Sequence, residues 1–125
     1  MAKTVLNTIP VLPVSDLKRS LQFYTETLGW KQDWSGEKVG SVSRDGSCLM
    51  LSQLIPVTSG NWAWVGLPND TLIETYRQAG VTIVQEPENW SWGYEMKIAD
   101  PDGNVLWLGT ATRTDLPVVD APPKD

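Results

Sequence analysis

The sequence repeats one order of predicted elements, and this repeat limits the folds open to the chain. In each half, a segment of strand character precedes an amphipathic helix, a second strand and a hairpin. The hairpins turn at Asp45-Gly46 and at Asp102-Gly103. Asp-Gly between extended runs is the strongest short hairpin signal, because both turn positions tolerate positive φ. The sequence therefore predicts an α+β fold made of two βαβββ units.

The two units are expected to associate, because each alone would expose one apolar sheet face. Their bounds are about residues 4–54 and 61–110, followed by a tail over 111–125. A chain of 125 residues is the size of one ordinary domain, so we predict a single domain whose mixed sheet curves round a cleft. The proline-containing tail after Leu116 has little that could pack and is predicted to fray.

The first segment, Thr4–Val14, is rich in β-branched residues but also contains Pro10 and Pro13. Proline lacks the backbone donor that an interior strand uses. We therefore expect either an edge strand or a strand exchanged with a second copy of the chain.

The other elements of the first unit follow from spacing. A helix capped by Ser15 or Asp16 and ended by Gly29 is predicted, because apolar residues recur at helical intervals at Leu17, Leu21, Tyr24 and Leu28. Strands are then expected over Trp30–Trp34, Val39–Ser43 and Ser47–Ser52.

The second unit repeats this order. A helix is predicted from Asn69 or Asp70 to Gly80, with one strand before it and three after it. These strands are expected over Trp62–Gly66, Val81–Gln85, Gly93–Ala99 and Asn104–Gly109.

Charge and composition restrict the partners. The chain has 15 acidic and 10 basic residues and a net charge of −5, which disfavours nucleic acid and anionic membranes and suits a cationic or neutral partner. No apolar run approaches the roughly 20 residues that cross a bilayer, and the start of the chain lacks an export pattern. The single Cys48 cannot form an internal disulfide. A cytoplasmic protein is expected.

The chain contains no His, which removes most catalytic chemistry. Zinc and other transition metals need imidazole, thiolate or clustered carboxylates, and the usual general base and every Ser-His or Cys-His pair are also missing. We therefore predict no metal, no cofactor and no enzymatic activity.

Several motifs resemble the vicinal oxygen chelate superfamily, which includes glyoxalases and extradiol dioxygenases, and the resemblance covers nearly the whole chain. The motifs are Ile9–Asp16, Phe23-Tyr24, Leu28-Gly29 and Asp100–Asn104. The chain is most similar to the bleomycin resistance proteins, which sequester the antibiotic without altering it. This branch is indicated by Ile9–Leu12, Gly29–Trp34 and Trp92–Glu95.

The resemblance also implies where a metal would bind in enzymatic members. Those positions hold Ile9 and Trp107 here, and the remaining ones fall near Asn61 or Ala63 and within Leu49–Leu51. None of these residues is a good ligand. The resemblance further implies a homodimer that exchanges its first strand and builds two grooves.

A set of residues is predicted to bind the ligand. Trp stacks on planar groups and attracts cations, which suits the bithiazole and the charged terminus of bleomycins. By resemblance, the groove residues lie at the end of the second strand, in the Trp-Gly loop and on neighbouring strands, and Trp107 is expected to fill the space of the metal. The set is Asp33, Trp34, Val39, Ser52, Trp62, Trp92, Glu95 and Trp107.

Other interpretations stay open. Trp30 is expected in the core, Trp62 and Trp64 fit either core or dimer interface, and Asp33 and Glu95 fit solvated surface carboxylates. The alternative function is a divergent glyoxalase-like or dioxygenase-like enzyme that uses carboxylates or Tyr94 as acid or base. A third is a scaffold whose tryptophans bind another protein.

Overall fold

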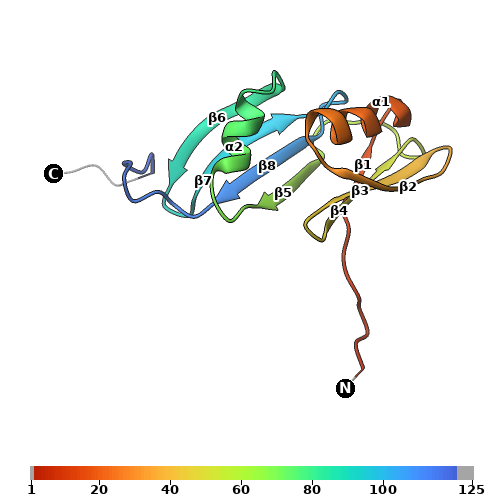
Figure 1. Ribbon diagram of the computed structural model, residues 1–125, viewed down its shortest axis with the longest axis horizontal. Coiled ribbons are helices and arrows are strands. Elements are labelled where there is room, and N and C mark those ends of the chain that lie inside the picture. Colours follow the sequence, from red (N-terminus) through yellow and green to blue (C-terminus); the bar gives the residue numbers. More distant parts are fainter. Residues whose placement is uncertain (1, 121–125) are drawn as a thin grey trace. The chain divides into compact units, whose positions relative to one another are not determined.

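The computed structural model describes residues 2–120 and divides the chain into two compact units, Met1–Ser59 and Gly60–Asp125. Each unit has the element order βαβββ and one four-stranded sheet with a single parallel strand pair (Figure 1). The predicted α+β fold with two βαβββ units is confirmed. No helix within residues 2–120 combines the length and apolar character needed to cross a membrane.

The sheet of unit 1 has the strand order β1-β4-β3-β2. Because β1 lies at the edge and pairs in parallel with β4, Pro13 interrupts no interior ladder. Residues 2–10 form no strand in the described chain and run away from this sheet (Figure 1), so the strand predicted from Thr4 begins only at Val11. The strands are β1 (Val11–Pro13), β2 (Lys31–Ser35), β3 (Val39–Arg44) and β4 (Ser47–Ser52).

The helix of unit 1 starts and ends as the sequence predicts. It consists of α1 (Leu17–Gln22) and a π-helical turn, η1 (Phe23–Thr27). The Asp16 side chain caps it by accepting a hydrogen bond from Arg19 N at 3.1 Å, and Gly29 ends it at φ 76°. The predicted apolar face is buried, and Trp30 joins the core at 5% exposure.

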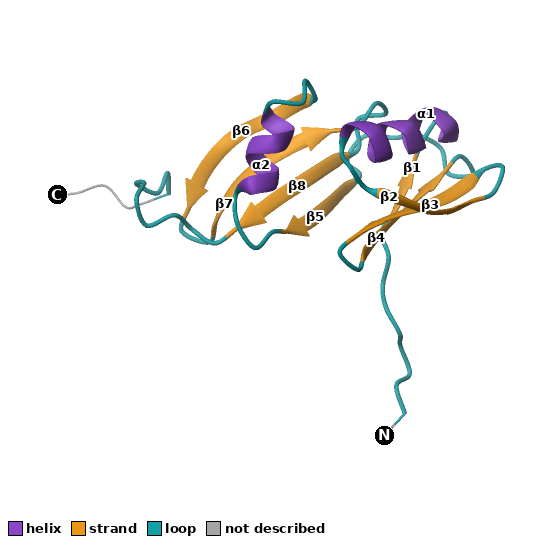
Figure 2. Ribbon diagram, viewed as in Figure 1, coloured by secondary structure: helices purple, strands orange, loops and turns teal. Residues whose placement is uncertain are grey.

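The sheet of unit 2 has the order β5-β8-β7-β6, and α2 (Thr71–Arg77) lies over one of its faces (Figure 2). Ile73 and Tyr76 of the helix are buried. The same core contains Met96, Ile98, Leu106 and Leu108 of the sheet. The strands are β5 (Trp62–Gly66), β6 (Thr82–Trp90), β7 (Gly93–Ala99) and β8 (Val105–Thr110).

The two Asp-Gly turns differ. Asp45 and Gly46 both have positive φ, 50° and 84°, as the predicted two-residue turn requires. In the second hairpin the Asp100 carboxylate accepts hydrogen bonds from the backbone N–H groups of Asp102 and Asn104, both at 2.9 Å. This carboxylate organises a longer connection, so β7 and β8 are not joined by a two-residue turn.

The chain after Leu116 does not fray over residues 117–120, so that prediction is wrong there. Val119 N donates to Asn89 O at 2.8 Å, and Ser91 N donates to Asp120 Oδ1 at 2.8 Å. The buried Asn89 side chain also donates to the carbonyl oxygens of Arg113 and Leu116. The rest of the predicted tail, residues 121–125, lies outside the described residues.

Candidate functional site

The sheet of unit 2 has one face under α2 and one open face. Residues directly opposite on neighbouring strands share a face. The register pairs Trp64 with Trp107, Trp107 with Lys97, and Lys97 with Gln85, which places all four on the open face. We call this surface the tryptophan face; it comprises Trp62, Trp64, Gln85, Trp90, Trp92, Glu95, Lys97 and Trp107.

The centre of the tryptophan face is an aromatic pair with a lysine over it. The rings of Trp62 and Trp107 meet edge to face, with centroids 6.1 Å apart and planes at 84°. Lys97 Nζ lies 5.4 Å and 4.9 Å from these two centroids, which is cation–π distance. The same ammonium donates to Gln85 Oε1 at 2.8 Å. The protein's own cation therefore occupies the most aromatic part of the face.

The end of the face beside the β6–β7 turn carries a carboxylate. Glu95 is only 4% exposed, and its Oε1 accepts a hydrogen bond from Trp92 Nε1 at 3.0 Å. Trp92 stacks on Trp90, with centroids 4.8 Å apart and planes at 14°. Glu95 forms no other hydrogen bond within residues 2–120. Of the two interpretations left open by the sequence, the solvated surface carboxylate does not describe Glu95. The carboxylate has room for a further hydrogen bond from a cation or another donor.

Two glycines make room for these side chains. A Cβ at Gly66 would lie 2.7 Å from Trp64 Cη2, and a Cβ at Gly109 would lie 3.1 Å from Trp64 Nε1 and 3.4 Å from Glu95 Oε2. The indole of Trp64 therefore lies flat across the backbone of both strands. Larger residues at these positions would displace the ring and crowd the carboxylate.

The other predicted residues belong to unit 1. Trp34 is 48% exposed on β2, and Asp33, at a β-bulge, accepts a hydrogen bond from Ser43 Oγ at 2.8 Å. Val39 and Ser52 are cross-strand partners. Ser52 is buried, and its Oγ accepts a hydrogen bond from Leu54 N at 3.1 Å. The geometry of Ser52 thus gives it a role in the turn after β4.

The sequence alone does not tell which tryptophans of unit 2 lie in the core and which lie at the surface. Their exposed fractions answer this question. Trp62, Trp64 and Trp92 are 50%, 63% and 61% exposed, so none of them is a core residue of its unit. Trp107 is half-buried. Within unit 2, the predicted residues Trp62, Trp92, Glu95 and Trp107 all lie on the tryptophan face.

Lys97 and Gln85 of the tryptophan face are not among the residues predicted from the sequence to bind the ligand. The predicted hairpin of β7 and β8 contains the signal for Lys97, because its register sets this residue opposite Trp107. Gln85 has no such signal. Register shifts lie on both sides of it, so simple alternation along β6 does not predict which face of the sheet it lies on.

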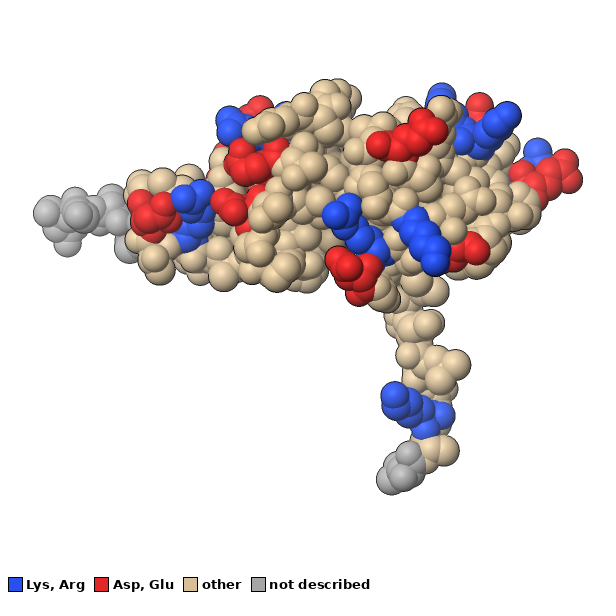
Figure 3. Space-filling model, viewed as in Figure 1, with Lys and Arg blue, Asp and Glu red and all other residues tan. Residues whose placement is uncertain are grey.

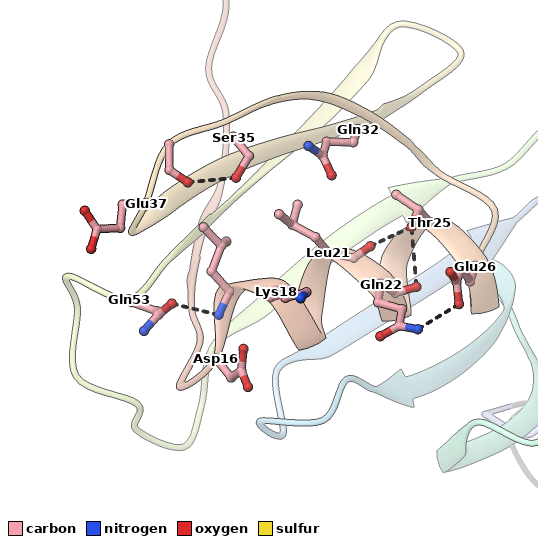
Figure 4. A pocket seen from close by; sticks show the side chains of 12 residues that line it. Asp16, Lys18, Leu21, Gln22, Thr25, Glu26, Gln32, Ser35, Glu37 and Gln53 are labelled. Carbon is pink, nitrogen blue, oxygen red and sulfur yellow. Dashed lines mark hydrogen bonds between the residues drawn. The ribbon is translucent and has the colours of Figure 1, made fainter.

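A pocket of about 580 Å³ lies in unit 1 between α1 and the end of β2. Figure 4 shows Lys18, Gln22 and Glu26 on the helical side and Gln32 with Ser35 on the strand side. None of the eight predicted site residues lines this pocket. Its lining is mostly polar and solvated, so it is a weaker candidate for a planar ligand than the tryptophan face.

Acidic and basic side chains are interspersed over the surface drawn in Figure 3. Arg113, for example, pairs with Asp115 at 2.6 Å and with Asp70 at 3.5 Å. The hydrogen bond between Arg113 and Asp115 raises the pKa of the guanidinium and lowers the pKa of the carboxyl. On the open face of unit 2, the tryptophan face has its own carboxylate, Glu95, and Glu88 lies opposite it on β6.

Paired βαβββ units of this kind define a class of small-molecule binding proteins and metal-dependent enzymes built on one fold. The chain belongs to the Glyoxalase/Bleomycin resistance protein/Dioxygenase superfamily, whose family model matches residues 6–108. The superfamily predicted from the motifs is thus confirmed. A comparison with curated proteins gave no match.

Solved structures support this assignment. The bleomycin-binding protein from bleomycin-producing Streptomyces verticillus, complexed with copper(II)-bleomycin, is 28% identical over 90% of this chain and 100% of its own, with a TM-score of 0.74. An antibiotic binding protein from Streptomyces sp. CB03234 is 24% identical over 89% and 100%, with a TM-score of 0.74. The bleomycin resistance determinant encoded on the transposon Tn5 is 21% identical over 86% and 98%, also at 0.74. For the last two structures, which are less than 25% identical to this chain, the similarity concerns the fold alone.

The residues at the expected metal positions do not fit a metal ion. Ile9 has no donor atom, and the ring nitrogen of Trp107 carries a proton and offers no lone pair in the ring plane. Within residues 2–120, no group of three or more His, Cys, Asp or Glu side chains is close enough to hold a metal.

Proposed function

We propose that this protein binds and sequesters a bleomycin-family or similar planar cationic antibiotic and confers resistance without chemically modifying it. The observation that carries the proposal is the tryptophan face, where exposed indoles lie beside the buried carboxylate of Glu95. The similarity to the bleomycin-binding protein of Streptomyces verticillus supports the same function.

The physical basis is stacking combined with charge. An indole offers a broad flat surface at a small entropy cost, and stacking on an aromatic side chain contributes about 1 to 3 kcal/mol per planar group. The cation of the ligand is expected near Glu95, because Lys97 repels it from the Trp62–Trp107 pair. Trp92, which donates to Glu95, is the proposed stacking anchor.

Residues of unit 1 are proposed as further contacts on the strength of the family resemblance. Trp34 is half exposed and presents a flat aromatic side chain, while Asp33 offers a carboxylate beside it. Val39 and Ser52 complete the proposed set. The Ser52 hydroxyl already accepts a hydrogen bond from Leu54 N in the turn after β4. We also propose a cytoplasmic homodimer as the functional form.

The test is a titration of the purified protein with metal-free bleomycin and, separately, with copper(II)-bleomycin. Tryptophan fluorescence reports the first titration, and calorimetry reports both, because copper quenches fluorescence without requiring a specific contact. Saturation at one ligand per chain is expected. The absence of heat and of quenching at high micromolar ligand would remove bleomycin as the ligand.

A further inference from the structure

The centre of the tryptophan face carries a row of hydrogen-bond donors that lack acceptors. Gln85 on β6, Lys97 on β7 and Trp107 on β8 are cross-strand neighbours in one line. Gln85 Nε2 and Trp107 Nε1 are buried, and neither has a hydrogen-bond partner within residues 2–120. The Lys97 ammonium has three N–H groups and makes one hydrogen bond, to Gln85 Oε1 at 2.8 Å.

Such a cluster is costly in a protein that binds nothing there. A buried donor without an acceptor loses its hydration and gains nothing in return, and native structures contain few of them. Here two occur on either side of one lysine. An acceptor brought by a ligand would satisfy the Lys97 ammonium, and it would reach the two covered N–H groups when the side chains over them move.

The positive charge of Lys97 determines which kind of acceptor suits these three donors. Glu95 shares the face, but it forms no ion pair with Lys97 and is hydrogen-bonded to Trp92. The positive charge of Lys97 lies over the faces of the Trp62 and Trp107 rings and forms no ion pair within residues 2–120. An anionic or strongly polar oxygen satisfies this environment, whereas an ammonium does not.

We propose that the row of Gln85, Lys97 and Trp107 is a subsite for an acceptor oxygen, such as a carboxylate, phenolate or carbonyl, on a planar aromatic ligand. The exposed indoles of Trp62 and Trp64 flank the ring that carries this oxygen. The inference rests on the proposed function and deepens it, because the ligand then has its acceptor over Lys97 and its cation near Glu95. Lys97 moves off the indole rings when its ammonium turns to the acceptor.

Two probes that share a naphthalene ring and carry opposite charges test the subsite. Calorimetric titration with 2-naphthoate and with 2-naphthylmethylammonium separates an acceptor site from a cation site. Because Glu95 is itself a proposed cation contact, the comparison is made in Glu95→Gln, where we expect naphthoate to bind at least tenfold more tightly. Lys97→Met keeps most of the apolar stem and should abolish this preference, while Lys97→Arg should retain it. Lys38→Met, at an exposed position of unit 1, is the matched control and should change neither affinity.

A second readout does not depend on how well the Lys97 variants fold. In a nitrogen–proton correlation spectrum, the indole N–H signal of Trp107, assigned with Trp107→Phe, should shift downfield with naphthoate and not with the ammonium probe. Equal affinity for the two probes, no naphthoate binding at millimolar concentration, or an unmoved Trp107 signal would overturn the subsite.

The bleomycin titration separates failure of the subsite from failure of the proposed function. Saturable bleomycin binding without naphthoate preference leaves sequestration in place and removes the subsite. Naphthoate binding that depends on Lys97, without bleomycin binding, keeps the subsite and removes bleomycin as the ligand.

Discussion

Glu95 is the residue whose environment says most about a ligand, because a buried carboxylate normally has more than one hydrogen bond. Glu95→Gln keeps the shape and an acceptor for Trp92 but removes the charge. We expect it to weaken binding of metal-free bleomycin by about 1.5 to 3 kcal/mol, the usual contribution of a charged hydrogen bond. Calorimetry measures the affinity, and thermal unfolding should show equal or higher stability because an under-satisfied buried charge is removed.

The control for this variant is Glu37→Gln, an exposed carboxylate in the turn after β2. It should bind bleomycin as the wild type does. If Glu95→Gln binds normally but unfolds more easily, Glu95 is a structural residue and the proposed cation contact is wrong.

Trp92 and Trp30 should respond to truncation in opposite ways. Trp92 is 61% exposed, so Trp92→Ala is expected to weaken ligand binding by about 1 to 3 kcal/mol. Its effect on unfolding should be limited to the lost hydrogen bond to Glu95, at most about 1 to 3 kcal/mol. Trp30 is 5% exposed, so Trp30→Ala is expected to lower the free energy of unfolding by about 3 to 5 kcal/mol. Urea titration and calorimetry on both variants separate the two roles. A stability loss in Trp92→Ala with unchanged affinity would make Trp92 structural.

Among the elements, the chain from Arg113 to Asp120 is bonded at several points to one buried side chain, Asn89. The Asn89 amide donates to the Arg113 and Leu116 carbonyls, and its oxygen accepts from Arg113 N at 2.8 Å. Asn89→Ala leaves these groups unsatisfied and should cost about 1 to 3 kcal/mol of stability. Hydrogen exchange should accelerate at the Arg113 and Val119 amides. Gln78→Ala, at an exposed position after α2, should change neither quantity. Unchanged exchange in Asn89→Ala would show that other contacts hold this segment.

Elements with plain alternation could be predicted from the sequence, and those fixed by distant contacts could not. The bounds of β4, β5 and β7 agree with the prediction, because Asp-Gly pairs and closely spaced apolar or aromatic residues are local signals. β6 runs on to Trp90 through two register shifts that no local pattern marks. The longer Asp100 turn likewise depends on a side chain that bonds backbone groups ahead of it.

The same distinction applies to the candidate site. Residues marked by local motifs could be predicted from the sequence, and contacts between distant strands could not. The predicted hairpin placed Trp107 on the sheet, and the Trp-Gly motif pointed to Trp92 and Glu95. The burial of Glu95 depends on the space left by Gly109, and the position of Gln85 depends on register shifts within β6. Such cross-strand effects are not visible in one sequence.

For the whole molecule, a homodimer stays a prediction. Residues 2–10 form no strand, and Val5 and Leu6 are 67% and 89% exposed, which suits a segment that pairs with a second copy. Sedimentation at micromolar concentration should give twice the mass of one chain. A variant lacking residues 2–9 should sediment as a monomer if exchange of this segment holds the dimer. A monomeric full-length chain would contradict the prediction.

A protein that sequesters bleomycin stoichiometrically, without altering it chemically, should protect DNA from the drug. Plasmid DNA is incubated with bleomycin and iron at increasing concentrations of the protein, and its cleavage is measured. The protein is then denatured, and the mass of the recovered drug is measured by mass spectrometry. Under sequestration, cleavage should stop when the number of binding sites equals the number of drug molecules, and the recovered drug should have its original mass. Protection by protein far below the drug concentration, or a changed drug mass, would contradict sequestration and indicate an enzyme.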